Sequence, residues 1–105
     1  MHITMVKKRL ATGEACAKCV QAEERLRERG HWDKVDSILW ADESDPKSPG
    51  WELARTYNVE IAPFYLVRDD DGTTRVYLSV LKLMKEVMSA SRDAGTSLDI
   101  EASAK

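Results

Sequence analysis

The sequence lacks the features that mark several large classes of protein. Its 105 residues include only two cysteines, one phenylalanine and three prolines, and no stretch approaches the roughly 20 apolar residues of a membrane helix. Lysine and arginine number 16 against 18 acidic residues, for a net charge of −2, so no strong basic field favours nucleic acid. No apolar run follows the basic residues 7–9, so we expect no secretory signal and no export. Partners of the nucleic-acid and membrane classes are therefore not expected.

The length of the chain suits one domain with one hydrophobic core. Residues 92–105 are small and polar, so we expect a domain over residues 1–91, a flexible tail over residues 92–105, and a monomer. Without an export signal the expected compartment is the cytoplasm, where structural disulfides are rare. Two cysteines in such a chain favour a redox or metal-binding interpretation over a structural one.

Apolar periodicity predicts an α/β fold in which strands and helices alternate. The order strand-helix-strand-helix-strand-strand-helix predicts a four-stranded mixed sheet with helices on both faces and a parallel first pair of strands. Asp71-Gly72 between two apolar runs predicts a closing hairpin. We expect strands at residues 3–10, 35–40, 64–68 and 74–78, and helices at residues 16–29, from the Ser48-Pro49 start, and from a Ser79 cap. Inward-facing residues are expected to be Trp51, Ala54 and Tyr57 in the second helix and Val80, Leu83, Met84 and Val87 in the third, with Trp40 in the core.

The pair Cys16 and Cys19 falls where the first loop meets the first helix. A helix N-terminus presents unpaired N–H groups and a partial positive charge, which favour the thiolate that attacks disulfides. Lys18 adds a nearby positive charge and Glu14 opposes it. Because Cys19 lies one turn after Cys16 on the same side, Cys16 is expected to be the exposed nucleophile and Cys19 the more buried, resolving thiol.

Two other interpretations of the cysteines are open. A structural zinc site needs four ligands, and His2 and His31 are available to complete one, although His2 precedes the first expected strand and His31 follows the far end of the first expected helix. Cysteine is also often buried as a small apolar residue without chemistry. We expect no metal and no cofactor.

Ala62-Pro63 precedes the third expected strand, where a proline is tolerated at the first position. With the Cys-x-x-Cys pair after the first strand and this proline before the hairpin, the chain resembles the thioredoxin and glutaredoxin superfamily over about residues 3–90. The resemblance implies a thioredoxin-like fold, a cis Pro63 beside the cysteines, and an Ala62 backbone that binds substrate. Ala17 and Lys18 stand between the cysteines where these families usually carry other pairs, so no subfamily is assigned.

The leading hypothesis is a small thiol-disulfide oxidoreductase that works through a mixed disulfide. Cys16 and Cys19 are its predicted catalytic residues, Ala62 and Pro63 its predicted substrate-binding residues, and Lys18 its predicted pKa-tuning residue. The expected partners are a disulfide-containing protein or small molecule and an unidentified electron donor. The alternatives are a non-enzymatic thioredoxin-like binding module and a metal-binding protein.

Overall fold

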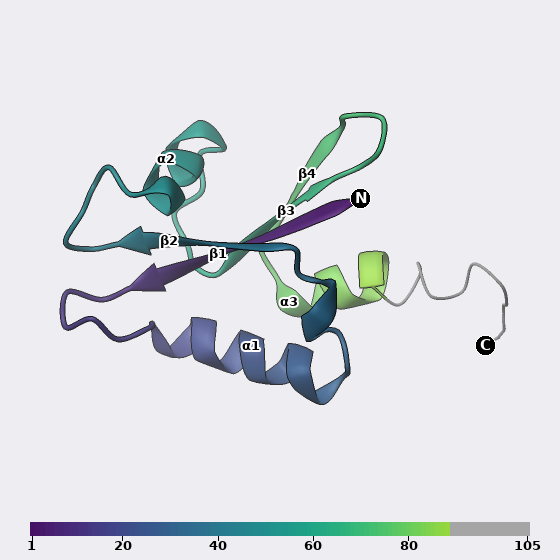
Figure 1. Ribbon diagram of the computed structural model, residues 1–105, viewed down its shortest axis with the longest axis horizontal. Helices are drawn as coiled ribbons and strands as arrows, with labels where there is room; N and C mark the ends of the chain where they lie inside the picture. Colours follow the sequence, from purple (N-terminus) through teal and green to yellow (C-terminus); the bar gives the residue numbers. More distant parts are fainter. Residues whose placement is uncertain (89–105) are drawn as a thin grey trace, which may run out of the picture.

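The computed structural model describes residues 1–88, and these residues form the strands and helices in the predicted order (Figure 1). The predicted tail over residues 92–105 and the last three residues of the predicted domain lie outside the described residues. None of the helices in residues 1–88 combines the length and the apolar character of a membrane span. The elements are β1 (His2–Arg9), α1 (Ala17–Glu28), a 3-10 turn (Trp32–Lys34), β2 (Ser37–Asp42), α2 (Pro49–Thr56), β3 (Phe64–Arg68), β4 (Thr74–Tyr77), α3 (Val80–Leu83) and a π-helical turn (Met84–Met88).

The four strands form one mixed sheet in the order β2-β1-β3-β4. β1 pairs in parallel with β2 and antiparallel with β3, and β3 pairs antiparallel with β4. Figure 1 shows α1 and α3 on one side of the sheet and α2 on the other. The expected parallel first pair, the closing hairpin and the helices on both faces are confirmed.

Alternation along the central strands produces two separate cores, because successive side chains of a strand point to opposite faces. In β3, Tyr65 and Val67 belong to one core, whereas Phe64 and Leu66 belong to the other. The core on the α1 side, here the α1-side core, consists of Ile3, Met5, Ala22, Leu26, Tyr65, Val67, Tyr77, Leu83, Met84, Val87 and Met88. The α2-side core consists of Val6, Ala41, Ala54, Phe64 and Leu66.

The predicted stop of the first helix is confirmed at Gly30. This residue has a φ of +72°, a backbone conformation that glycine adopts without steric cost. Its N–H donates to the carbonyl of Arg27 and the N–H of His31 donates to the carbonyl of Leu26. This pair of bonds is the Schellman arrangement that satisfies the last carbonyls of a helix, and it returns the chain toward β2.

The predicted start of the second strand is wrong by two residues. Val35 closes the 3-10 turn by donating its N–H to Trp32, and Asp36 bonds Ile3 twice, through its own N–H and through its carboxylate. These bonds hold residues 35 and 36 outside the strand, which begins at Ser37.

Two aromatic residues are less buried than predicted. Trp40 is only partly buried, because β2 is an edge strand, and its ring packs against two cations, with Lys7 Nζ at 4.6 Å and Arg9 Cζ at 4.2 Å from its centroid. Tyr57 follows the last turn of α2 and is 37% exposed. The predicted burial of Ala54, Leu83, Met84 and Val87 is confirmed.

Candidate functional site

A tight loop between β1 and α1 places the cysteine pair. Within it, Gly13 donates to the carbonyl of Leu10 at 2.8 Å, and Leu10 donates to the carbonyl of Glu14 at 2.7 Å. Gly13 has a φ of +94°, which a residue with a side chain rarely adopts. Beyond this turn the N–H of Cys16 donates to the carbonyl of Lys8 at 3.0 Å. The loop therefore returns the first cysteine to the end of β1.

Cys16 is the N-cap residue of α1. Its carbonyl accepts the N–H groups of Cys19 at 3.0 Å and Val20 at 3.1 Å. No side chain caps the helix, and the N–H groups of Ala17 and Lys18 have no hydrogen-bond acceptor among residues 1–88. Unpaired donors at a helix N-terminus, together with the helix dipole, favour negative charge. The structure thus places Cys16 at a helix N-terminus whose first N–H groups are unpaired within the described residues.

The two sulfur atoms lie 3.0 Å apart, within hydrogen-bond distance, and both thiols are free. Cys16 is partly exposed, whereas Cys19 is fully buried with 0% of its surface accessible. The Sγ atom of Cys19 also accepts a hydrogen bond from the N–H of Lys8 at 3.3 Å. The predicted difference in exposure between the two cysteines is present, and the pair is close enough to form a disulfide with a small movement.

The environment of Cys19 keeps its thiol protonated. Burial is the largest cause of the raised pKa of Cys19, and the hydrogen bond with the Cys16 sulfur acts in the same direction. The Lys8 N–H and the charge of Lys7 oppose this rise without reversing it. Burial and the contact with Cys16 therefore favour the protonated form of the Cys19 thiol.

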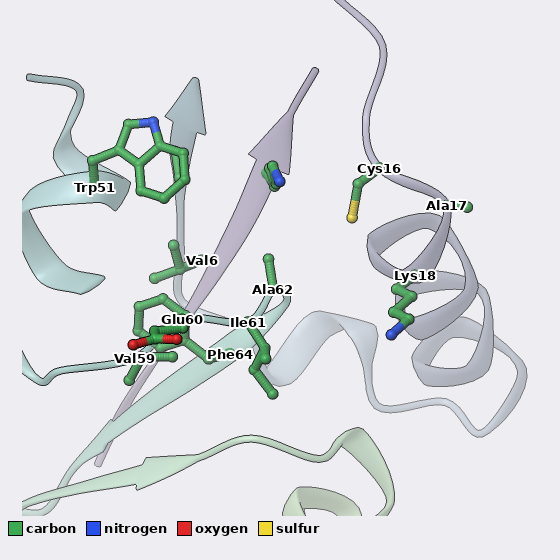
Figure 2. Close-up of a pocket in the computed structure, with 12 residues that line it drawn as sticks. Val6, Cys16, Ala17, Lys18, Trp51, Val59, Glu60, Ile61, Ala62 and Phe64 are labelled. Carbon is green, nitrogen blue, oxygen red and sulfur yellow. The ribbon is translucent and has the colours of Figure 1, made fainter. Parts of the chain in front are cut away.

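Lys18 stands on the first turn of α1, between two cavities that it helps to line. Its side chain is exposed and extends away from the Cys16 sulfur in Figure 2. The predicted influence of Lys18 on the cysteine pKa stays a prediction.

The segment before β3 lies beside the cysteine pair. The peptide bond between Ala62 and Pro63 is cis. Ala62 lines the same cavity as Cys16, and Pro63 lines the second cavity together with Lys18. The structure thus brings the predicted site residues Cys16, Lys18, Ala62 and Pro63 to one end of the sheet. Their roles stay predictions.

The cavity beside Cys16 has a volume of about 380 Å³. Figure 2 shows the Cys16 sulfur turned toward the space that separates it from Trp51. The remaining wall is mainly apolar, with Lys8, Lys18 and Glu60 as its charged residues. The apolar lining residues are Val6, Ala17, Ala41, Trp51, Val59, Ile61, Ala62 and Phe64.

Nine of the twelve residues that line this cavity were not predicted as site residues, among them Trp51, Val59 and Ile61. Trp51 was predicted to face inward, and it forms a wall of the cavity while its Nε1 donates to the carbonyl of Asp42 at 2.7 Å. Val59 and Ile61 precede Pro63 on the same loop, and Ile61 is exposed despite its apolar character. No sequence signal identifies this wall, because its residues come together only in the folded chain.

The histidines considered for a metal site lie elsewhere. His2 begins β1, at the end opposite the cysteine loop, and its Nε2 lies 2.9 Å from Ser37 Oγ. His31 is buried beyond the far end of α1 and contacts Lys34 through Nδ1. Among residues 1–88 no three histidine, cysteine or acidic side chains are grouped so that they could hold a metal ion.

Comparisons with known proteins bear on the fold alone. No protein-family model matches the sequence, and no curated protein matches it. The solution structure of a thioredoxin from Thermus thermophilus is similar to this structure with a TM-score of 0.50 and 20% sequence identity, over 90% of this chain and 77% of that chain. The chain therefore has a thioredoxin-like α/β fold, as the resemblance implied.

Proposed function

We propose that the protein is a thiol-disulfide oxidoreductase that uses Cys16 and Cys19 as its dithiol and disulfide couple. The observation that carries the proposal is the sulfur pair itself. One sulfur is partly exposed at a helix N-terminus and turned toward a cavity, and the other is buried 3.0 Å behind it. A disulfide bond is about 2.04 Å long, so an approach of about 1 Å would join the two atoms.

The reaction takes two exchanges. The Cys16 thiolate attacks one sulfur of a substrate disulfide, which forms a mixed disulfide and releases the other substrate sulfur as a thiolate that takes up a proton. Cys19 then gives up its proton and attacks Cys16 Sγ, which forms the Cys16–Cys19 disulfide and releases the second substrate thiol. The substrate gains two electrons and two protons, and the protein loses them. A separate dithiol donor must reduce the protein again, and the reverse sequence oxidises a substrate dithiol.

The surroundings of Cys16 support a substrate-binding role for the neighbouring loop. Ala62 lines the Cys16 cavity with its neighbour Ile61, and we propose that the Ala62 backbone and Pro63 hold the chain that carries the substrate disulfide. The substrate is a protein or small-molecule disulfide. We propose a cytoplasmic location and catalysis by a monomer without a cofactor.

Serine variants of the two cysteines test the proposal. The reduced wild-type protein is mixed with a symmetrical nitrobenzoate disulfide, whose thiolate is coloured, and the products are alkylated and weighed by mass spectrometry. Wild type should release two thiolates per chain and end as the internal disulfide. Cys19→Ser should release one and retain the mixed disulfide on Cys16, and Cys16→Ser should react far more slowly because its only thiol is buried.

A wild-type protein that reacts no faster than Cys16→Ser would overturn the proposal and favour a binding module. The reduction potential then gives the direction of exchange. A value near about −270 mV suits a reductant and one near about −120 mV an oxidant.

A further inference from the structure

The hydroxyl group of Tyr65 is buried without a hydrogen-bond partner. Tyr65 is 0% exposed, and its Oη is the one buried side-chain nitrogen or oxygen atom without a partner within residues 1–88. A phenylalanine would fill the same volume without the free-energy cost of an unpaired buried hydroxyl. The hydroxyl is therefore unexplained by packing.

Its neighbour Tyr77 provides the contrast. The two tyrosines are paired across β3 and β4 and belong to the same α1-side core. The hydroxyl of Tyr77 accepts a hydrogen bond from Arg75 Nη1 at 2.9 Å and donates one to Glu86 Oε1 at 3.2 Å. At two adjacent positions of one sheet face, one hydroxyl group both accepts and donates a hydrogen bond, and the other has no partner.

The position of Tyr65 connects it to the resolving cysteine. Tyr65 lies two residues after Pro63, on the sheet face that packs against Ala22 and Leu26 of α1. Cys19 belongs to the same buried stripe of that helix, three residues before Ala22. The charge of Cys19 also contributes, after burial, to the raised pKa of Tyr65, so the two groups lie within electrostatic range.

We propose that Tyr65 is a positioning residue for the second exchange, in which its O–H group stabilises the Cys19 thiolate as that thiolate attacks Cys16. This inference rests on the proposed oxidoreductase function. The Cys19 proton goes to the departing substrate thiolate by way of solvent, and Tyr65 keeps its own proton throughout. A hydroxyl that is unsatisfied in the dithiol form thus gains its partner when a buried negative charge appears beside it.

The structure leaves room for this contact. No hydrogen bond joins Tyr65 Oη to Cys19 Sγ in the dithiol form, where the Cys19 sulfur already contacts Lys8 and Cys16. A second cavity of about 250 Å³ is lined by Tyr65 and Ala22 together with Lys18 and Pro63. A water molecule from the cavity, or a small shift of the Cys19 side chain, completes the contact once the thiolate forms.

The test compares Tyr65→Phe with the matched variant Tyr77→Phe in stopped-flow mixing with the nitrobenzoate disulfide. The first release of coloured thiolate reports the attack by Cys16, and the second reports the attack by Cys19. Tyr65→Phe should leave the first phase unchanged, slow the second about tenfold at neutral pH, and shift its pH profile upward by about one unit. Tyr77→Phe should leave both phases as in wild type, although it removes two hydrogen bonds and lowers the unfolding midpoint.

Failure of the oxidoreductase function and failure of the Tyr65 role give different results. If wild type gives no first phase, the oxidoreductase function itself is wrong. If wild type gives both phases and the second phase of Tyr65→Phe keeps the wild-type rate and pH profile, the role of Tyr65 is wrong. Equal slowing in both variants, or loss of folded structure in Tyr65→Phe by circular dichroism, would show that the tyrosine acts through packing and would also overturn the inference.

Discussion

The two faces of the sheet differ in the helices that cover them and in the size of the core beneath. On the α1 side, two helical segments cover the sheet and the α1-side core contains several fully buried side chains, among them Leu26 and Met5. On the α2 side, a single eight-residue helix covers the smaller α2-side core. Three members of that smaller core, Val6, Ala41 and Phe64, also line the 380 Å³ cavity. The larger of the two cavities described above therefore lies against the α2-side core, whereas the 250 Å³ cavity borders Tyr65 and Ala22 of the α1-side core.

The two cysteines divide between these faces. Cys19 continues the buried stripe of α1, whereas Cys16 opens toward the cavity on the α2 side. One short segment therefore holds both an accessible and a buried sulfur atom. Both residues lie at the start of α1, so three residues of sequence separate an open environment from a closed one.

Truncation of a buried leucine on each face is the most severe test of this difference. Leu26→Ala should lower the free energy of unfolding by about 3–4 kcal/mol, because a tightly packed neighbourhood cannot collapse into the space left behind. Leu66→Ala on the α2 side should cost about 2 kcal/mol, because α2 is short and its surroundings can relax. Urea unfolding of both variants gives the comparison. Equal losses would show that the two faces are packed alike.

The close approach of α2 to the sheet depends on Gly50. A Cβ atom at this position would clash with the backbone of Ala41 and lie 2.6 Å from the carbonyl oxygen of Trp40. Gly50→Ala should therefore push α2 outward and cost about 2–3 kcal/mol. Since Trp51 follows in the same helix, the cavity should widen and the Trp51 fluorescence should change. Alanine at Gly13 meets no atom within 4 Å, so a Gly13→Ala variant, strained only by its φ, serves as the contrast. A Gly50→Ala protein as stable as wild type would contradict this account.

The two faces also differ in the ion pairs that adjacent lysines of β1 form. Lys7 is buried on the α1 side and its Nζ lies 2.8 Å from Glu23, whereas the pair of Lys8 and Glu43 on the other side is about one third exposed and 3.2 Å apart. Glu23→Gln should cost about 1–2 kcal/mol, between the values for surface and buried pairs. Glu43→Gln should have a much smaller effect. Urea unfolding measures both changes, and comparable losses in the free energy of unfolding would show that the two ion pairs contribute equally on the two faces.

The pH dependence of the same pair has a defined sign. The hydrogen bond from Lys7 is the main cause of the lowered pKa of Glu23, with Arg27 acting in the same direction. A lowered pKa contributes stability above the unfolded value of about 4.3, and this contribution is lost as the pH falls through the folded pKa. The difference in stability between wild type and Glu23→Gln should therefore shrink on acidification below about pH 4.5.

Much of the fold could be predicted because its signals are local. The bounds of β3 follow from its continuous apolar run, and the hairpin and the last helix follow from Gly72 and the Ser79 cap, whose Oγ accepts the N–H of Lys82. The start of β2 could not be predicted, because the Asp36 bonds to Ile3 join segments 33 residues apart. The partial exposure of Trp40 likewise depends on strand order, which makes β2 an edge.

The site was predictable where spacing alone determines geometry. The separation of Cys16 and Cys19 by one turn anticipates both their proximity and their difference in burial. The cavity was not predictable, since it requires Trp51, Ile61 and the small side chain of Ala41 to meet from three segments. The unpaired hydroxyl of Tyr65 also escapes sequence reasoning, because only the folded chain brings Arg75 and Glu86 to the Tyr77 hydroxyl and leaves that of Tyr65 without a partner within residues 1–88.

The last prediction tests the burial of Cys19. The raised pKa of Cys19 means that its folded thiol stays protonated where an unfolded thiol, with a pKa of about 8.5, ionises. Stability from this group is complete below about pH 8.5 and falls above it, with a slope that approaches about 1.4 kcal/mol per pH unit. Between pH 8.5 and 9.5 the reduced wild type should therefore lose about 1 kcal/mol more than Cys19→Ser, as measured by urea unfolding under reducing conditions. Tyrosine ionisation cancels in this comparison, because both proteins contain the same tyrosines. Parallel pH profiles for the two proteins would place Cys19 in an environment as open as that of Cys16, and the division of the pair between the two faces would fail.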